Sequence, residues 1–295
     1  MFSVRFWGVR GSMPCPGSTT VIYGGNTSCI EIRADDRLII VDLGTGVRPL
    51  GEWLMDNDFK KKGKIDADIF LTHTHWDHIM GFPIFAPVYM KGSCLRITAP
   101  VSIESENIEA VIKKQLSYSY WPVNAHELAA NIEFNQIGET TLDLGDGLTV
   151  ISKHLNHPVL CLGYRFNYQG RSLVTVFDHE PFHNLYQGDS GKEAEEGEAA
   201  AREENEKIIR FMEGADVLIH DAQYSQNEYF QHLGWGHASC EHAIDSAVKA
   251  NVRKLVLFHH DPEHTDRQLK QLEKSYAKKS PVKLIMAKEG MTLQV

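Results

Sequence analysis

Short apolar, β-branched stretches recur along the chain and predict β-strands. They are bounded by polar or turn-forming residues, which is the pattern typical of strands. They lie at residues 29–32, 38–41, 69–71, 95–98, 148–151, 160–166, 173–177, 217–219, 255–258 and 282–286. Helical periodicity and good terminal signals predict fewer helices, at residues 108–116, 203–212, 240–250 and 266–278. This pattern indicates layered sheets flanked by helices.

Several predicted strands end directly in residues that can bind a metal ion. Strand 38–41 runs into Asp42, and strand 69–71 runs into a histidine-rich segment. The strands at 173–177, 217–219 and 255–258 run into Asp178-His179, His220-Asp221 and His259-His260-Asp261. If these strands share a sheet, their ends converge on one rim, where functional loops commonly lie above a rigid scaffold.

The segment 191–206 is the one low-complexity part of the chain and is rich in Glu and Ala. We interpret it as a solvated, partly mobile insertion that runs into the helix at 203–212. No internal repeat or strong linker interrupts the chain, so we expect a single domain over residues 1–295.

Composition narrows the function further. The chain has 295 residues, of which 42% are hydrophobic, so it can bury a large core. Its formal net charge of -9 makes it a poor default binder of long polyanions. Five well-separated cysteines without a CxxC pair favour a reducing cytoplasm. No secretory h-region and no run of 18 apolar residues is present, so we expect no membrane span.

The segment His73-Thr74-His75-Trp76-Asp77-His78 is the strongest chemical signal among the fifteen histidines. His73 and His75 are two residues apart on an extended chain, so both side chains point to the same side and can hold one ion. Asp77 and His78 follow where the chain turns towards a helix, so they can face a second ion. Imidazole and carboxylate ligands suit zinc, manganese or iron.

This HxHxDH segment resembles the signature of the metallo-β-lactamase superfamily. The resemblance implies an α/β (α+β) fold, a four-layer αββα sandwich of two mixed β-sheets flanked by helices. It implies one metallo-β-lactamase-like domain over residues 1–295 and two divalent metal ions, with Zn²⁺ expected first and Mn²⁺ or Fe²⁺ as alternatives. It also implies that later loops supply a histidine, a bridging aspartate and a final histidine, in that order.

The chain offers candidates in the same order. We prefer His157 over His154 as the first, and Asp178 is the bridging aspartate. For the final histidine, the resembling segment of the tRNA 3′-processing nucleases favours His259 over His260. Successive side chains of a strand point to opposite sides, so only one of the two should bind. The implied set is His73, His75 and His157 for one ion, Asp77, His78 and His259 for the other, and Asp178 between them.

Three further segments resemble phosphodiesterases of this superfamily. Residues 6–12 together with 24–28 are similar to cyclic-nucleotide phosphodiesterase-like hydrolases. Residues 216–222 are similar to the DxLIHEAT segment of tRNase Z-type enzymes, with Asp221 where that family has Glu. Residues 236–239 resemble their GHST segment, which supplies a proton-handling histidine.

The resemblance implies catalytic roles for His237, Asp221 and Asp77. A hydroxide that bridges the two ions would attack phosphorus, and His237, oriented by Asp221, would protonate the leaving oxygen. We expect Asp42 to orient the metal loop by hydrogen bonds rather than to bind metal. For His220 two roles are equally expected: a functional role in the segment that resembles DxLIHEAT, or that of a buried, hydrogen-bonded core residue.

The expected function is therefore a phosphodiesterase that cleaves a small phosphodiester such as a cyclic nucleotide. An RNA 3′-end processing nuclease is an alternative, but the sequence has no evident clamping arm or basic surface for RNA. A non-catalytic sensor that keeps its metals to bind a ligand is a second alternative. Nothing in the sequence decides between a monomer and a homodimer. The aromatic residues at 118–122 are expected to pack in the core, with an apolar wall over the site as the alternative.

Overall fold

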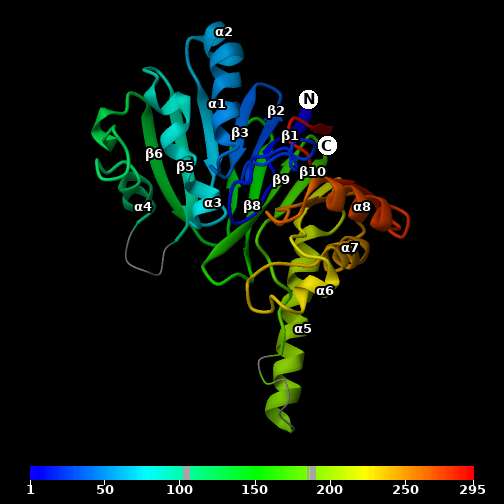
Figure 1. Ribbon diagram of the computed structural model, residues 1–295. Helices are drawn as coiled ribbons and strands as arrows, with labels where there is room; N and C mark the ends of the chain where they lie inside the picture. Colours follow the sequence, from blue (N-terminus) through cyan, green and yellow to red (C-terminus); the bar gives the residue numbers. More distant parts are fainter. Residues whose placement is uncertain (102–106, 185, 187–190) are drawn as a thin grey trace.

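The computed structural model describes residues 1–101, 107–184, 186 and 191–295. Within these residues two mixed sheets of seven strands each pack face to face, and helices cover both outer faces (Figure 1). This arrangement confirms the predicted αββα sandwich. No helix of the described residues is long and apolar enough to cross a membrane.

The first sheet has the strand order β14-β1-β2-β3-β4-β5-β6. Its antiparallel pairs are β14 with β1, β1 with β2, and β2 with β3, whereas β3 to β6 are parallel. The strands are β1 (Phe2–Gly8), β2 (Cys29–Ala34), β3 (Arg37–Val41), β4 (Asp66–Phe70), β5 (Cys94–Pro100), β6 (Asn131–Ile137) and β14 (Thr292–Gln294).

The second sheet has the order β13-β12-β11-β10-β9-β8-β7. Strands β10 to β13 are parallel and β7 to β10 are antiparallel. The strands are β7 (Thr141–Asp143), β8 (Leu148–Leu155), β9 (Cys161–Tyr168), β10 (Arg171–Val176), β11 (Val217–Asp221), β12 (Lys254–Phe258) and β13 (Lys283–Met286). The carboxyl ends of the parallel strands in both sheets carry the polar residues singled out in the sequence.

Helices of the first half of the chain lie beside the first sheet and those of the second half beside the second sheet (Figure 1). The former are α1 (Val47–Leu54), α2 (Lys60–Lys62), α3 (Trp76–Ile79) and α4 (Ile108–Lys114). The latter are α5 (Lys192–Met212), α6 (Gln226–Tyr229), α7 (Cys240–Lys249) and α8 (Asp266–Ala277). A π-helical turn at Met55–Phe59 joins α1 to α2, and short 3-10 turns lie at Phe82–Ile84, Ala86–Tyr89 and Ala125–Glu127.

Three apolar clusters hold the four layers together. Strand β3 contributes side chains to two of these clusters. Ile39 and Val41 point between the sheets, whereas Leu38 and Ile40 point to the helices of the first sheet. Strand β12 does the same for the second sheet and its helices. Successive side chains of a strand point to opposite faces. Central strands covered on both faces are therefore nearly continuously apolar, as the sequence pattern indicated.

The sequence missed some elements, and one expectation about side-chain packing was wrong. Strands β1, β6, β7 and β14 and helix α1 were not predicted, because charged or amide side chains interrupt the apolar runs of β1 and β6. The segment 191–206 and the predicted helix at 203–212 form one continuous helix: α5 begins at Lys192, because Glu and Ala are good helix formers, and it extends away from the sandwich (Figure 1). Tyr118 and Tyr120 are exposed, so core packing holds only for Trp121, which packs partly buried against the first helical layer.

Candidate metal centre

The loop after β4 is shaped by a buried carboxylate. Asp42, directly after β3, accepts hydrogen bonds from the backbone N–H of Thr72 (2.8 Å) and from its hydroxyl (3.0 Å). The Nδ1–H of His78 donates to the same carboxylate at 2.6 Å. Asp42 is fully buried, and its bonds fix both ends of the histidine-rich loop. It therefore has the orienting position that the sequence predicted.

The structure brings one predicted set of ligands together on the outer side of this loop. Single ligand atoms of His73, His75, His157 and Asp178 all lie within 4.8 Å of one another. The Nε2 atom of His157 is 3.0 Å from Nδ1 of His75, and Nε2 of His73 is 3.5 Å from Oδ2 of Asp178. Three imidazoles and one carboxylate around one point match the ligands of a zinc-type ion.

A second set meets on the other side of Asp178. Ligand atoms of Asp77, His78, His259 and Asp178 lie within 4.8 Å of one another. Oδ2 of Asp178 is 3.3 Å from Nε2 of His78, and its Oδ1 is 3.2 Å from Nε2 of His259. The two oxygens of Asp178 therefore face both groups, which is the bridging position expected from the sequence.

Three of the residues at the centre have left-handed backbones. Asp42, Asp178 and His259 have φ angles of 64°, 47° and 61°, and each follows the end of a parallel strand. The left-handed conformation costs roughly 1–2 kcal/mol for a residue with a side chain. Asp and His adopt it more readily than most residues. The sharp bend turns each side chain back over the edge of its sheet.

Hydrogen bonds on the far side of each ring aim the imidazoles inward. Nδ1–H of His157 donates to the carbonyl of Gly236 (2.9 Å), and Nδ1–H of His259 donates to Oε1 of Gln223 (2.9 Å). These bonds favour the tautomer whose Nε2 lone pair points to the centre. Nε2 of His73 and Oδ1 of Asp178 are buried without a hydrogen-bond partner among the described residues. A buried polar atom left in this way costs about 1–3 kcal/mol, so bound cations fit this centre.

The electrostatics of the two groups differ. Burial holds the pKa of His73 and His75 below the usual range, and burial lowers the pKa of His157 to about 4. These rings are neutral at pH 7, as metal ligands must be. Burial also lowers the pKa of His78, but the carboxylates of Asp178, Asp77 and Asp42 outweigh it and raise that pKa. The second group therefore attracts positive charge.

His237 and Asp221 form a pair beside the shared aspartate. Their Nδ1 and Oδ2 atoms are 2.8 Å apart, and Nδ1 of His237 is 4.0 Å from Oδ2 of Asp178. Asp221 is fully buried at the end of β11, and His237 lies in the loop that precedes α7. The predicted proton donor lies next to the centre, and Asp221, His237, Asp178 and His259 form a third group whose ligand atoms lie within 4.8 Å of one another.

The alternatives left open in the sequence are separated by position. His260 points away from the centre and donates from Nε2 to the carbonyl of Ala287 at 2.9 Å. His154 lies within β8 and belongs to neither group. His220 is fully buried, and its Nδ1–H donates to the carbonyl of Asp221 at 2.7 Å, as the core interpretation predicts. The metal and catalytic roles of the assembled residues remain predictions.

Three residues that support the centre were not predicted. Gln223 orients His259, and the backbone N–H of Ser12 donates to Oδ2 of Asp77 at 2.7 Å. Glu180, two residues after Asp178, accepts the N–H groups of the loop before His237. No sequence signal marked Gln223 or Glu180, because both act through contacts with segments far apart along the chain.

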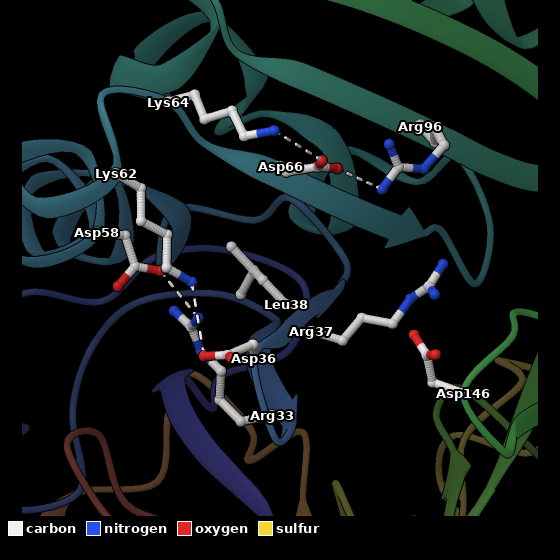
Figure 2. A pocket seen from close by; sticks show the side chains of 10 residues that line it. All are labelled: Arg33, Asp36, Arg37, Leu38, Asp58, Lys62, Lys64, Asp66, Arg96 and Asp146. Atoms are coloured by element: carbon white, nitrogen blue, oxygen red, sulfur yellow. Dashed lines mark hydrogen bonds and ion pairs between the residues drawn. The ribbon is translucent and has the colours of Figure 1, made fainter.

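A surface pocket of about 410 Å³ lies at the opposite end of the first sheet (Figure 2). It is lined at the amino ends of β3 and β4 by charged side chains that neutralise one another. Arg37 and Arg96 hold the buried carboxylate of Asp68 at 2.9 and 2.6 Å, and Arg96 also pairs with Asp66 at 2.7 Å. We interpret these ion pairs as structural.

Comparisons with known proteins show what the chain is similar to. Ribonuclease Z from Exiguobacterium sibiricum is 27% identical over 232 residues, which cover 68% of this chain and 73% of that protein. The structure of the short form of human tRNase Z superposes with a TM-score of 0.66 at 19% identity over 99% of both chains. A diphosphatase from the PhnP family superposes with a TM-score of 0.65 at 17% identity, over 100% of this chain and 98% of the other.

The two structural similarities concern the fold alone, because both identities are low. A family model described as the beta-lactamase superfamily domain matches residues 37–260, which contain every residue of the two ligand groups and the His237–Asp221 pair. The chain belongs to the beta-lactamase superfamily, and its fold is that of the metallo-β-lactamase proteins.

Proposed function

We propose that this member of a hydrolase superfamily is a dinuclear metal-dependent phosphodiesterase that cleaves a small phosphodiester, such as a cyclic nucleotide. One observation carries the proposal: two groups of ligand atoms share Asp178, and the His237–Asp221 pair lies beside the shared carboxylate. A pair of ion positions next to a proton-carrying group suits in-line hydrolysis of a phosphate ester.

In this proposal the seven residues hold two divalent ions, of which Zn²⁺ is the first candidate. His73, His75 and His157 would hold one, Asp77, His78 and His259 would hold the other, and Asp178 would serve both. Two such ions supply an activated water near neutral pH and neutralise charge on the phosphoryl oxygens. Asp42, Gln223 and the carbonyl of Gly236 keep the imidazoles in place while substrate binds and leaves.

His237 is the proposed general acid. Burial lowers the pKa of His237, but the adjacent Asp221 carboxylate outweighs this and raises that pKa to about 9. The ring is therefore protonated at neutral pH. Its Nδ1–H is engaged by Asp221, so the opposite ring atom, Nε2, carries the proton that is given to the leaving oxygen. Such a proton transfer contributes on the order of 10²–10⁴ in rate.

The charge around the centre supports a small substrate. In the described part of the chain, the side chains that form hydrogen bonds or ion pairs with the seven residues include no lysine or arginine. Lysine and arginine strengthen the binding of a long polyanion, because their contacts with phosphates release condensed counterions. Without these residues, a long polyanion would bind weakly. The name of the relatives, Ribonuclease Z, favours RNA 3′-end processing as the second candidate.

A chromogenic diester tests the proposal. The protein is stripped of metal, reloaded with Zn²⁺ or Mn²⁺, and assayed with bis(p-nitrophenyl) phosphate. Turnover that returns with metal supports the phosphodiesterase, whereas metal binding without turnover supports the sensor alternative. A panel of cyclic nucleotides, dinucleotides and tRNA precursors then separates the two substrate classes, because a tRNA nuclease would process the precursor RNA preferentially.

A further inference from the structure

Large apolar side chains are exposed on two loops that belong to the metal centre. Trp76 lies between His75 and Asp77 at the start of α3, and 74% of it is exposed. On the loop before His237, Trp235 is 59% exposed, and Phe230 and Leu233 are also exposed. Exposed apolar side chains grouped at one place commonly mark a binding site.

The two tryptophans are chain neighbours of residues that meet at the centre. Trp76 is the chain neighbour of His75, and Trp235 is the neighbour of Gly236, whose carbonyl binds His157. The rings of His75 and His157 are in edge-to-face contact, with 4.9 Å between their centroids. The two loops therefore approach the centre at one pair of touching imidazoles.

The loop that carries Trp235 is anchored rather than loose. The buried carboxylate of Glu180 accepts hydrogen bonds from the N–H groups of Gly234 (2.9 Å) and Gly236 (2.8 Å). Gly236 has a φ of 84°, and a Cβ there would lie 2.3 Å from Nδ1 of His157, so the loop must approach this closely without a side chain. Glu180 is therefore a positioning residue for Trp235.

A stack of rings supports the tryptophan from below. Trp235 contacts His232 edge to face at 4.7 Å, and His232 stacks on the buried Tyr224 at 4.4 Å with an angle of 10° between the planes. The Trp235 ring is thus held in a fixed position while more than half of its surface faces solvent. Fixed aromatic rings are the platforms on which nucleobases stack.

The segments that carry these loops contain no lysine or arginine. They are residues 11–32, 71–90, 154–164, 220–248 and 259–266, which supply most of the centre and its surroundings. A long nucleic acid is held by many phosphate contacts, which these segments cannot provide. Stacking of one or two bases needs no such contacts.

We propose that Trp76 and Trp235 form a stacking rim that recognises the nucleobase of a small phosphodiester of one or two nucleotides. This inference rests on the proposed function and names its substrate class. The metal centre holds the scissile phosphate, and the rim holds the base. Stacking tolerates different bases because every base has a π-face, so the rim selects for the presence of a base more than for its identity.

Two esters with the same leaving group test this on the metal-loaded protein. Thymidine 5′-(p-nitrophenyl phosphate) carries a nucleoside, and methyl p-nitrophenyl phosphate does not. We expect a lower KM for the nucleoside ester. The substitutions Trp235→Ala and Trp76→Ala should each raise that KM by about 5- to 150-fold, the equivalent of one stacked base. Trp235→Phe should restore part of the loss, and the KM for the methyl ester should stay unchanged.

Tyr120→Ala is the matched control, because Tyr120 is an equally exposed aromatic residue that follows α4. Equal KM values for the two esters, or equal effects of the tryptophan and Tyr120 variants, would overturn the proposal. So would a KM that falls steadily with RNA length, or tryptophan variants that change only the oligomeric state. If neither ester is hydrolysed, the phosphodiesterase itself fails, and quenching of tryptophan fluorescence by adenosine monophosphate still tests the rim.

Discussion

The carboxylate of Asp221 is held so that Nδ1 of His237 can only donate to it. Oδ2 of Asp221 lies 2.8 Å from Nδ1 of His237, and the backbone N–H groups of His179 and Gln223 donate to the same carboxylate at 3.2 and 3.0 Å. Both oxygens accept hydrogen bonds, and the contact with Nδ1 favours one tautomer of His237. The sequence departs from its resembling family here, with Asp in place of Glu, yet the contact forms.

His237→Ala should slow hydrolysis of a diester by on the order of 10²–10⁴-fold, because the leaving oxygen would lose its proton donor. Asp221→Asn should act in the same direction by removing the charge that keeps His237 protonated. Metal content, measured by elemental analysis, should equal that of the unchanged protein in both variants. Loss of an ion from either variant would instead make that residue a ligand.

Replacing His75 or Asp178 with Ala should abolish hydrolysis and reduce metal uptake. Asp178 contacts both groups, so its loss should remove two ions, whereas the loss of His75 should mainly affect the group that contains His157. Isothermal titration with Zn²⁺ and a diester assay are the two measurements. His154→Ala is the control, since His154 is close to His157 in sequence but lies outside both groups, and normal turnover in Asp178→Ala would refute the assignment.

Asp42→Asn should weaken metal binding by about 10- to 100-fold without removing a ligand. The amide would keep the size of the side chain but lose the charge that orients the Nδ1–H of His78. Competition with a chelator of known affinity gives the dissociation constant. Asp68→Asn is the matched control, because Asp68 is a buried carboxylate of the same sheet that pairs with arginines at the opposite end. An equal loss in both variants would mean that Asp42 acts only on overall stability.

The partly buried His242 should make folding stability depend on pH in weak acid. Burial, with a smaller effect from the neighbouring His220, lowers the pKa of His242 to about 3. In the unfolded chain the pKa of this histidine is about 6.5, so below that pH the unfolded chain binds a proton that the folded protein does not bind. The free energy of unfolding therefore falls as the pH drops from 6.5 towards 3.

The slope from such a group is about 1.4 kcal/mol per pH unit. Urea unfolding of metal-free protein at pH 6.5 and pH 5 should therefore show a smaller loss in His242→Gln than in the unchanged chain. The variant His126→Gln changes an exposed histidine and should behave like the unchanged chain. Identical pH slopes for His242→Gln and the unchanged protein would contradict the prediction.

The sequence was informative where local pattern and physics coincide. The apolar run before Thr72 and the alternation of His73 and His75 depend only on neighbouring residues. The recurring apolar strands indicated layered sheets flanked by helices, whereas the αββα sandwich was implied by the family resemblance. The choice of His259 over His260 followed from strand alternation together with the resembling segment, and the two side chains do point apart.

Other features depend on contacts that no local pattern contains. Glu180 and Gln223 look like ordinary polar residues until the fold brings Gly236 and His259 beside them. Helix α5 was placed too late because its first half packs against little, and composition suggested a solvated insertion rather than a continuous helix. Strand β1 was missed because Arg5 interrupts its apolar run, although the strand pairs on both sides in the sheet.

The ligand atoms come from both halves of the sandwich. His73, His75, Asp77 and His78 follow a strand of the first sheet, whereas His157, Asp178 and His259 follow strands of the second. Cations held there would cross-link the two sheets at one edge of the sandwich. Because they would bind the folded form alone, they would add to its stability. A chelator would then weaken the contact between the two sheets. Amide hydrogen exchange should become faster first at the edge of the sandwich that carries the ligand residues.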